Sequence, residues 1–205
     1  MRNGNPVNVH VPKIERDKSA FLNVPYDSRY HKLFLAFIAG LSAYQLTPRA
    51  TIELPGGQRR LDRILELVQG CRYSFHDLSR VQLDRRPPAT PRFNMPFELG
   101  LTVALHVQQR DHDWFVFESR PARLSKSLSD LNGTDPYIHG GTAQGVFREL
   151  TNALVSIHHQ PTVAEMDRIY RKLLIAAPRI MKDAGTDSLL GARVFRDLAL
   201  VGSQL

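Results

Sequence analysis

Ala20-Phe21-Leu22-Asn23-Val24 is a short, mostly apolar run that ends at Pro25. Because its apolar residues are continuous and do not alternate with polar ones, the run is typical of a strand covered on both faces, as in parallel sheets. Residues 30–46 follow, with apolar side chains spaced three and four apart, which predicts a helix with a broad apolar face. A buried strand followed by a helix indicates the first part of a parallel βαβ unit.

The same alternation of strand and helix continues along the chain. Further strands are expected at residues 50–54, 71–75 and 114–118, with a short fifth strand at residues 137–139. Helices are expected at residues 61–68, 96–106 and 146–157. The pattern therefore predicts an α/β domain whose parallel sheet of four to five strands has helices on both faces.

The two ends of the chain differ from this pattern. We expect a flexible N-terminal arm over residues 1–18, the α/β domain over 19–160 and a C-terminal helical extension over 161–205. In the extension, Thr162 and Glu165 predict a capping box, and Pro178 is expected to end or kink the helix that follows. A last helix is expected at residues 188–200, and this helical pair packs either on the sheet domain or on a partner.

Composition excludes several classes of protein. The N-terminal stretch is polar and has no apolar run of the kind found in a secretory signal, and the longest apolar stretch, residues 33–46, is too short to span a bilayer. Cys71 is the only cysteine among 205 residues, which excludes an intrachain disulfide and a multi-cysteine zinc site. We expect a cytoplasmic protein without a metal and without contact with a membrane.

The formal net charge of +7 raises the question of nucleic-acid binding. The arginines are scattered, and their one local cluster, Arg80, Arg85, Arg86 and Arg92, is interrupted by prolines. A solvated basic surface explains the charge more simply than nucleic acid, which we do not expect as a partner. Attraction of a phosphorylated small molecule is a third interpretation of the same charge.

Polar residues follow three of the predicted elements at points where a ligand could bind. They are Tyr26 and Asp27 after the first strand, Asp77 and Ser79 after the third strand, and Asn94 at the start of the helix that carries Glu98. Ligands of open α/β sheets bind beyond the carboxyl ends of the strands, so we expect these clusters to meet in one cleft.

Glu98 is the best catalytic candidate in this set, since its neighbours Phe97 and Leu99 are apolar. We expect it in the first turn of its helix, where free backbone N–H groups and the helix dipole stabilise an anion. Such a carboxylate can act as a nucleophile or as the electrostatic partner of an oxocarbenium ion. The simpler interpretation is a glutamate that only favours the helix dipole.

Two other candidates also have simpler interpretations. Asp77 can hydrogen-bond a ribose hydroxyl or a nucleobase, or it can cap a turn. Tyr26 can stack on a base or cover the edge of the sheet. The sequence contains no phosphate-binding glycine loop and no nucleophile elbow for Ser-His-Asp chemistry.

Three stretches together resemble the superfamily of nucleoside 2-deoxyribosyltransferases and TIR-like domains: FLNVPY at 21–26, FHDLS at 75–79 and NMPFELG at 94–100. The resemblance implies a flavodoxin-like fold that cleaves N-glycosidic bonds of nucleosides, nucleotides or NAD. By it, Glu98 is the catalytic glutamate, Asp77 is the strand-end aspartate beside the substrate, and Tyr26 lies in the loop that contacts the sugar or base.

One departure from the family's pattern changes the expected substrate. Deoxyribosyltransferases carry an acid six residues before the glutamate, where this chain has Arg92. Arginine suits a phosphate, so we expect an N-glycosidase that acts on NAD or a related nucleotide, with Glu98 and Asp77 as catalytic residues. The expected substrate-binding residues are Tyr26, Asp27, Asn94, Arg92 and Ser79.

Two alternatives remain open at this point. The first is a non-catalytic sensor that binds a nucleotide in the same cleft and signals through its helical tail. The second is a basic nucleic-acid-binding module, whose binding would depend steeply on salt. NAD or a nucleotide enters as substrate, so no cofactor is expected, and the C-terminal helices are expected to form a homo-oligomer.

Overall fold

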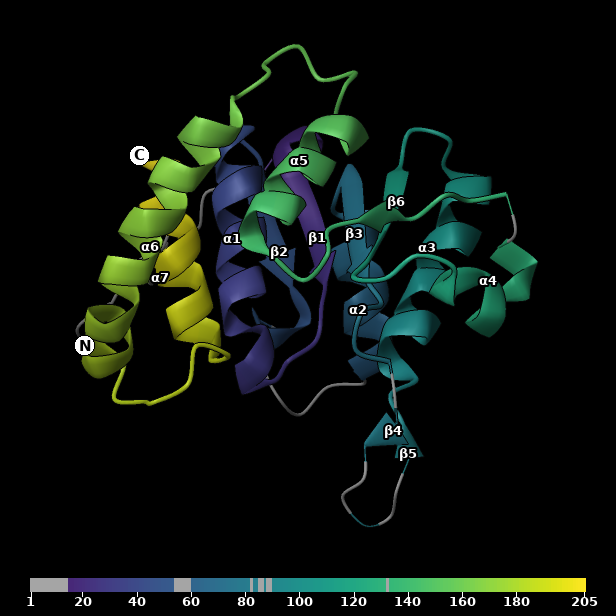
Figure 1. The fold of residues 1–205 in the computed structure, drawn as a ribbon, viewed down its shortest axis with the longest axis horizontal. Helices are drawn as coiled ribbons and strands as arrows, with labels where there is room; N and C mark the ends of the chain where they lie inside the picture. The colour runs from purple at the N-terminus through teal and green to yellow at the C-terminus, as the bar shows by residue number, and fades with distance from the viewer. Residues whose placement is uncertain (1–14, 54–59, 82, 85–86, 88–89, 132) are drawn as a thin grey trace, which may run out of the picture.

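The computed structural model describes residues 15–53, 60–81, 83–84, 87, 90–131 and 133–205 (Figure 1). Five parallel strands form one sheet in the order β2-β1-β3-β6-β7, which is the flavodoxin-like order. Their bounds are β1 (Ser19–Asn23), β2 (Thr47–Ala50), β3 (Tyr73–Asp77), β6 (Asp113–Glu118) and β7 (Tyr137–Ile138). The predicted fold class, a flavodoxin-like α/β sheet with helices on both faces and a C-terminal helical extension, is confirmed.

Seven α-helices lie in the described part of the chain. They are α1 (His31–Ala43), α2 (Arg60–Gln69), α3 (Asn94–Gln108), α4 (Arg123–Ser127), α5 (Ala143–Ala153), α6 (Val163–Asp183) and α7 (Ala192–Ser203). Strands β4 (Leu83–Asp84) and β5 (Thr90–Pro91) form a small antiparallel hairpin that projects from the body of the domain (Figure 1). No helix among the described residues combines the length and the apolar character needed to cross a bilayer.

The two faces of the sheet have separate cores. Strand β1 is buried at every position, as its continuous apolar run predicts. Leu22, Phe75 and Phe117 point toward α1, α5 and the C-terminal helices and belong to the larger core. Phe21 points the other way, into a smaller core beside α2 and α3. Because side chains alternate along a strand, neighbouring residues of β1 and β3 serve opposite faces.

The second and third strands do not lie quite where the sequence pattern predicts. Strand β2 ends at Ala50, and a 3-10 helix (Thr51–Glu53) follows it, because the Glu53 carboxylate accepts hydrogen bonds from the Ala50 N–H (2.7 Å) and the Arg49 side chain. Leu54, the end of the predicted strand, lies outside the described residues. Strand β3 runs two residues later than predicted, because the Cys71 N–H still bonds the Val68 carbonyl in the turn that ends α2.

The predicted long loop over residues 125–141 also contains more structure than expected. Helix α4 and a 3-10 helix (Ser129–Leu131) occupy its first part, and Leu124 anchors them in a small core under α3. The short strand expected near Tyr137 is present as β7. Burial of Leu124, with Leu128 and Leu131 packed against the same core, thus orders a segment whose composition is typical of a loop.

The C-terminal helices pack on the sheet domain, which is one of the two arrangements that the sequence left open. Helix α6 begins with the predicted capping box between Thr162 and Glu165, and its buried residues Met166, Ile169 and Leu173 join the larger core against α1. Pro178 does not end the helix, which continues to Asp183. Pro178 faces solvent, so water can solvate the carbonyl that lacks its helical hydrogen bond.

Part of the predicted N-terminal arm is attached to the domain. Residues 1–14 lie outside the described residues. A 3-10 helix (Arg16–Lys18) comes directly before β1, and the Arg16 side chain bonds Asp111 (2.6 Å) and the carbonyl of Gln69 (3.1 Å). The last residues of the expected arm therefore have a defined place at the amino ends of the strands.

Gly145 is needed where α5 begins behind β7. A Cβ atom there would lie 1.8 Å from the carbonyl oxygen of His139, which is backbone and cannot turn away. We expect Gly145→Ala to lower the free energy of unfolding by about 2 to 3 kcal/mol. Gly100→Ala is the matched control, because a Cβ there meets nothing within 4 Å on an exposed helix position and should stabilise by about 0.5 to 1 kcal/mol. Urea unfolding of both variants measures the contrast, and equal effects would contradict it.

Candidate functional site

A cavity of about 640 Å³ opens at the carboxyl ends of β1 and β3. The connections from these two strands lead to opposite sides of the sheet, so this is the point at which the strand order reverses and where such folds bind ligands. The walls come from the β1–α1 loop, the starts of α2 and α3 and the β4–β5 hairpin. The lining residues used below are Asn23, Tyr26, Arg60, Arg92, Phe93, Asn94, Met95 and Glu98.

Glu98 lies in this cavity, but its environment differs from the predicted one. Helix α3 begins at Asn94 and not at Pro96, so Glu98 falls in the second turn, away from the free N–H groups of the helix end. The residue is only 7% exposed. Burial raises the pKa of Glu98 from 4.5 to about 7, and the charge of Arg60 opposes the shift only in part. The carboxyl group is therefore poised between its neutral and ionised forms near neutral pH.

A second hollow of about 340 Å³ adjoins the first, and Glu98, Asn94 and Arg60 line both. Phe97 lines the second hollow and Phe93 lines the first, and both side chains are more than half exposed. Large exposed aromatic side chains beside a polar cavity are suited to cover a flat apolar group of a ligand.

Two substrate-binding candidates line the cavity as predicted. Asn94 stands at the start of α3. Tyr26 lies opposite, and its hydroxyl group is 3.0 Å from Oγ1 of Thr51, which fixes the ring against the end of β2. Burial raises the pKa of Tyr26 well above its usual range, so the phenol stays neutral. Both side chains therefore offer neutral polar groups to a ligand.

Arg92 also lines the cavity. Asp27 does not line it, but its carboxylate binds the Arg92 side chain. Oδ2 of Asp27 accepts hydrogen bonds from Nη1 of Arg92 (2.7 Å) and from Nε of Arg80 (2.6 Å). Burial opposes ionisation of Asp27, but the two guanidinium groups outweigh it and lower the pKa of the carboxyl. Asp27 is not among the lining residues, so its position supports a role in orienting Arg92 and not the predicted contact with substrate.

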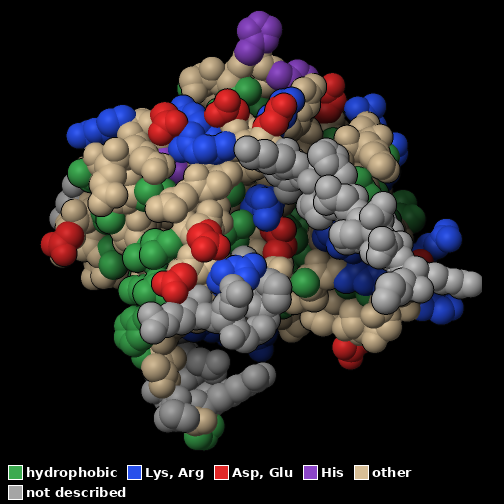
Figure 2. Space-filling model, turned by 180° about the vertical axis from the view of Figure 1, so that it is seen from behind, with side chains coloured by type: hydrophobic (Ala, Val, Ile, Leu, Met, Phe, Trp, Pro, Cys, Tyr) green, Lys and Arg blue, Asp and Glu red, His purple; other side chains and the backbone are tan. Residues whose placement is uncertain are grey.

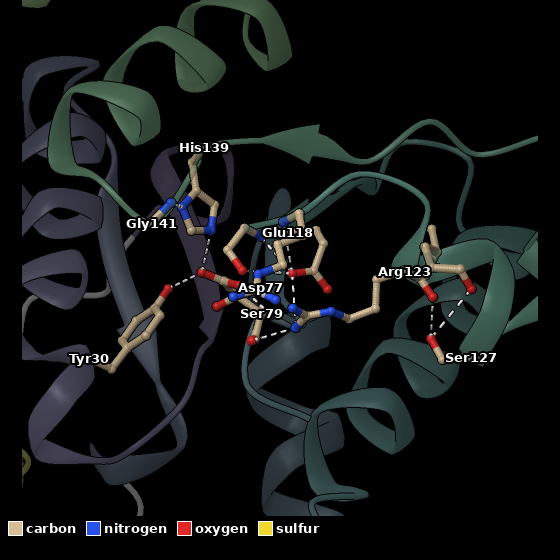
Figure 3. Close-up of polar contacts among 11 residues, drawn as sticks. Tyr30, Asp77, Ser79, Glu118, Arg123, Ser127, His139 and Gly141 are labelled. Atoms are coloured by element: carbon tan, nitrogen blue, oxygen red, sulfur yellow. Dashed lines mark hydrogen bonds and ion pairs between the residues drawn. The ribbon is translucent and has the colours of Figure 1, made fainter. Parts of the chain in front are cut away.

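Asp77 and Ser79 lie away from the cavity, in the buried cluster of Figure 3. Asp77 is fully buried on the α1 side of the sheet. Its carboxylate accepts hydrogen bonds from the Tyr30 hydroxyl and from the Ser79 N–H (2.7 Å). Nε2 of His139 approaches to 3.1 Å without full hydrogen-bond geometry. These contacts join the ends of β3 and β7 to the start of α1, and they do not support the predicted role of Asp77 beside the substrate.

The position of Ser79 follows from the same cluster. Its carbonyl accepts a hydrogen bond from Nη1 of Arg123 (2.7 Å), and Arg123 also pairs with the buried Glu118 (3.3 Å) (Figure 3). The segment after β3 is thereby tied down behind the cavity, so the predicted contact of Ser79 with substrate is not supported either.

Asn23, Arg60 and Thr90 are polar residues of the cavity lining that were not among the predicted site residues. Asn23 is the only polar side chain within the apolar run that becomes β1, and a polar group in such a run is a signal that could have identified it. Arg60 starts α2 and carries no comparable local signal, since only the packing of α2 beside α3 brings it to Glu98.

The described residues contain no group of three or more His, Cys, Asp or Glu side chains that could hold a metal ion. The acidic and basic side chains are intermixed on the face shown in Figure 2, without a continuous basic stripe. The fold and cavity together define an α/β domain of flavodoxin-like topology with a cavity at its switch point that polar and charged side chains line in part. Comparison with protein-family models, with curated proteins and with solved structures found no match.

The raised pKa of Glu98 predicts that the free energy of unfolding depends on pH. The folded protein holds the proton of Glu98 up to about pH 7, whereas the unfolded chain releases it near pH 4.5. The contribution of this group to the free energy of unfolding is therefore fully present below pH 4.5 and is lost as pH rises through 7. Glu98→Gln removes this dependence. Relative to that variant, the wild type should lose about 2 to 3 kcal/mol of unfolding free energy between about pH 5 and about pH 8. Urea unfolding at both pH values tests this, and a constant difference would contradict it.

Proposed function

We propose that this protein is an N-glycosidase that cleaves the base–ribose bond of NAD or a related nucleotide. The observation that carries the proposal is the placement of Glu98, a buried carboxyl group inside a cavity large enough for a nucleotide, at the switch point of a flavodoxin-like sheet. Strongly perturbed carboxyl groups in such cavities are typical of catalytic sites.

The chemistry requires an anion at the ribosyl centre. When the bond between C1′ and the base nitrogen breaks, its electron pair leaves with the base, and positive charge develops on the ribosyl group. The ionised form of Glu98 either stabilises this charge or forms a covalent bond to C1′. Water then adds a hydroxyl group to C1′. Where a covalent bond to Glu98 has formed, that bond breaks and its electron pair returns to the carboxylate, and the proton that the water loses passes to solvent or to Glu98.

Arg92 favours NAD over a nucleoside as the substrate. The family pattern has an acid at this position, which would protonate a leaving base. The nicotinamide of NAD⁺ is already cationic and leaves as a neutral molecule, so it needs no proton donor. Arg60 and Arg92 line the cavity and offer two cations for the pyrophosphate as charge-assisted donors.

Incubation of the protein with NAD and a panel of nucleotides, followed by chromatography of free bases, tests the proposal. We expect nicotinamide or another base to be released with ADP-ribose or a ribose phosphate as the second product. Nucleotide binding without release would favour the alternative of a non-catalytic sensor that uses the same cavity. Neither binding nor release would contradict both.

The expected cytoplasmic homo-oligomer remains part of this proposal. Helix α6 buries one face against α1 but leaves Leu174 and Ile175 exposed on the other, with Ile175 79% exposed. In an assembly of two or more copies through the C-terminal helices, these two side chains would be covered.

A further inference from the structure

The amide of Asn23 has one possible orientation. Nδ2 lies 2.8 Å from the backbone carbonyl oxygen of Met95, which can only accept a hydrogen bond. The exchange of Oδ1 and Nδ2 would place two acceptors against each other, so the NH₂ group must face Met95. Its second hydrogen points to Nδ1 of His76 at 2.9 Å. The amide is therefore held at both of its donor positions.

The same hydrogen bonds determine the tautomer of His76. Nδ1 accepts from Asn23, so it carries no hydrogen, and the neutral ring must carry its hydrogen on Nε2. His76 is fully buried, and burial, together with the nearby His112, lowers its pKa to about 3. The ring thus keeps this tautomer, and its acceptor, throughout the physiological pH range.

Burial of the His76 ring costs free energy, and the hydrogen bond between its Nδ1 and Asn23 explains why a histidine stands here. Nε2 is buried and has no hydrogen-bond partner among the described residues. An apolar ring at this position would pack beside Phe21 without the unpaired Nε2, but it would leave the second Nδ2 hydrogen of Asn23 without an acceptor. What the imidazole adds is the Nδ1 acceptor, which sets the direction of the Asn23 amide.

Once both hydrogens of Nδ2 are used, Oδ1 is the part of Asn23 left for a ligand. Within the described residues it accepts no hydrogen bond, and it is not among the atoms that are both buried and unpaired. Asn23 lines the cavity together with Glu98 and Met95. The cavity therefore presents a fixed neutral acceptor on the wall formed by β1, in addition to the carboxyl group on α3.

We propose that Oδ1 of Asn23 binds a ribose hydroxyl of the ligand and that His76 is the positioning residue that aims it. The inference rests on the proposed function for the class of ligand, a nucleotide. A ribose hydroxyl can donate a hydrogen bond to this acceptor, whereas an ionised phosphate has no donor to offer and would be repelled by the ionised form of Glu98. An amino group of the base is the other donor of a nucleotide, and the deoxy forms used below distinguish it from a ribose hydroxyl. The site should therefore distinguish a ribonucleotide from its deoxy forms.

Calorimetric titration with AMP, 2′-deoxy-AMP and 3′-deoxy-AMP tests this inference. In the wild type, loss of one of the two hydroxyls should weaken binding about tenfold. In Asn23→Ala the affinity for AMP and the affinity for the deoxy form that binds the wild type more weakly should become equal within about twofold. His76→Phe should also abolish the preference. His76→Asn should restore it, because its Oδ1 can take the place of the ring Nδ1.

Ser74→Ala is the matched control, since Ser74 is buried two residues before His76 on the same face of β3 and bonds His112 (2.8 Å). It should destabilise the protein without changing the preference for the hydroxyl. The preference is a ratio measured within each variant, so a general loss of stability does not move it. Should Asn23→Ala fail to fold, the contrast between His76→Phe and His76→Asn decides.

The outcomes separate this inference from the proposed function. AMP binding with the same deoxy penalty in the wild type and in Asn23→Ala overturns the inference and leaves the glycosidase proposal standing. A penalty that depends on Asn23, without base release from any nucleotide, supports the inference and overturns the glycosidase. No binding of AMP or its deoxy forms to the wild type overturns the inference.

Discussion

Glu98→Gln should lower the release of base from the substrate by about a thousandfold, which corresponds to about 4 kcal/mol of lost transition-state stabilisation. The amide has the shape of the carboxyl group but can neither become an anion nor attack C1′. Substrate affinity should change by less than about fivefold, because the neutral form of Glu98 is already populated near its pKa of about 7. Nicotinamide release followed by chromatography, with NAD binding measured by calorimetry, gives both quantities.

Glu66→Gln is the control for loss of one negative charge near the site. Glu66 lies on α2, its side chain is 72% exposed and it does not line the cavity. This variant should keep wild-type activity. Unchanged activity of Glu98→Gln would remove Glu98 from the mechanism, and equal losses in both variants would indicate a general electrostatic effect.

Asp77→Ala should lower the free energy of unfolding by about 3 to 5 kcal/mol, the largest effect on stability that we predict. Asp77 is fully buried, and its removal leaves the Tyr30 hydroxyl and the Ser79 N–H without their acceptor. Urea unfolding at neutral pH measures the loss. The milder variant Tyr30→Phe removes one of these donors and should cost about 1 to 3 kcal/mol.

This prediction distinguishes a residue of the core from a residue of the site. Tyr30→Phe leaves the cavity lining unchanged, so a folded sample of this variant should bind nucleotide as the wild type does. If Asp77→Ala were as stable as the wild type and lost nucleotide binding, Asp77 would belong beside the substrate, as the family resemblance implies.

Several features of this fold depend on local sequence alone. The continuous apolar run of β1 predicted a central strand because only a strand covered on both faces can bury every side chain. The helical spacing after it predicted α1, and Thr162 with Glu165 predicted the start of α6. Element ends were less predictable, because β2 ends where the Glu53 side chain caps Ala50, a contact that no periodicity contains.

The site was predictable only in part, for a geometric reason. The sequence predicted Glu98, Tyr26, Asn94 and Arg92 as residues of the site, and all four line the cavity. Asp77 also stands at the end of a strand, but its side chain points to the opposite face of the sheet from its neighbour His76. Side chains alternate along β3, and the sequence does not say which face holds the pocket.

Tertiary packing decided the rest. Helix α1 closes over Asp77 through Tyr30, while α2 and α3 leave a hollow over Asn23 on the opposite face. Arg60 reaches Glu98 only because α2 lies beside α3. The sequence by itself determined which segments are buried, since burial depends on the apolar pattern of each segment. Which polar groups meet a ligand depends on how helices distant in sequence cover the two faces, and only the folded chain determines that.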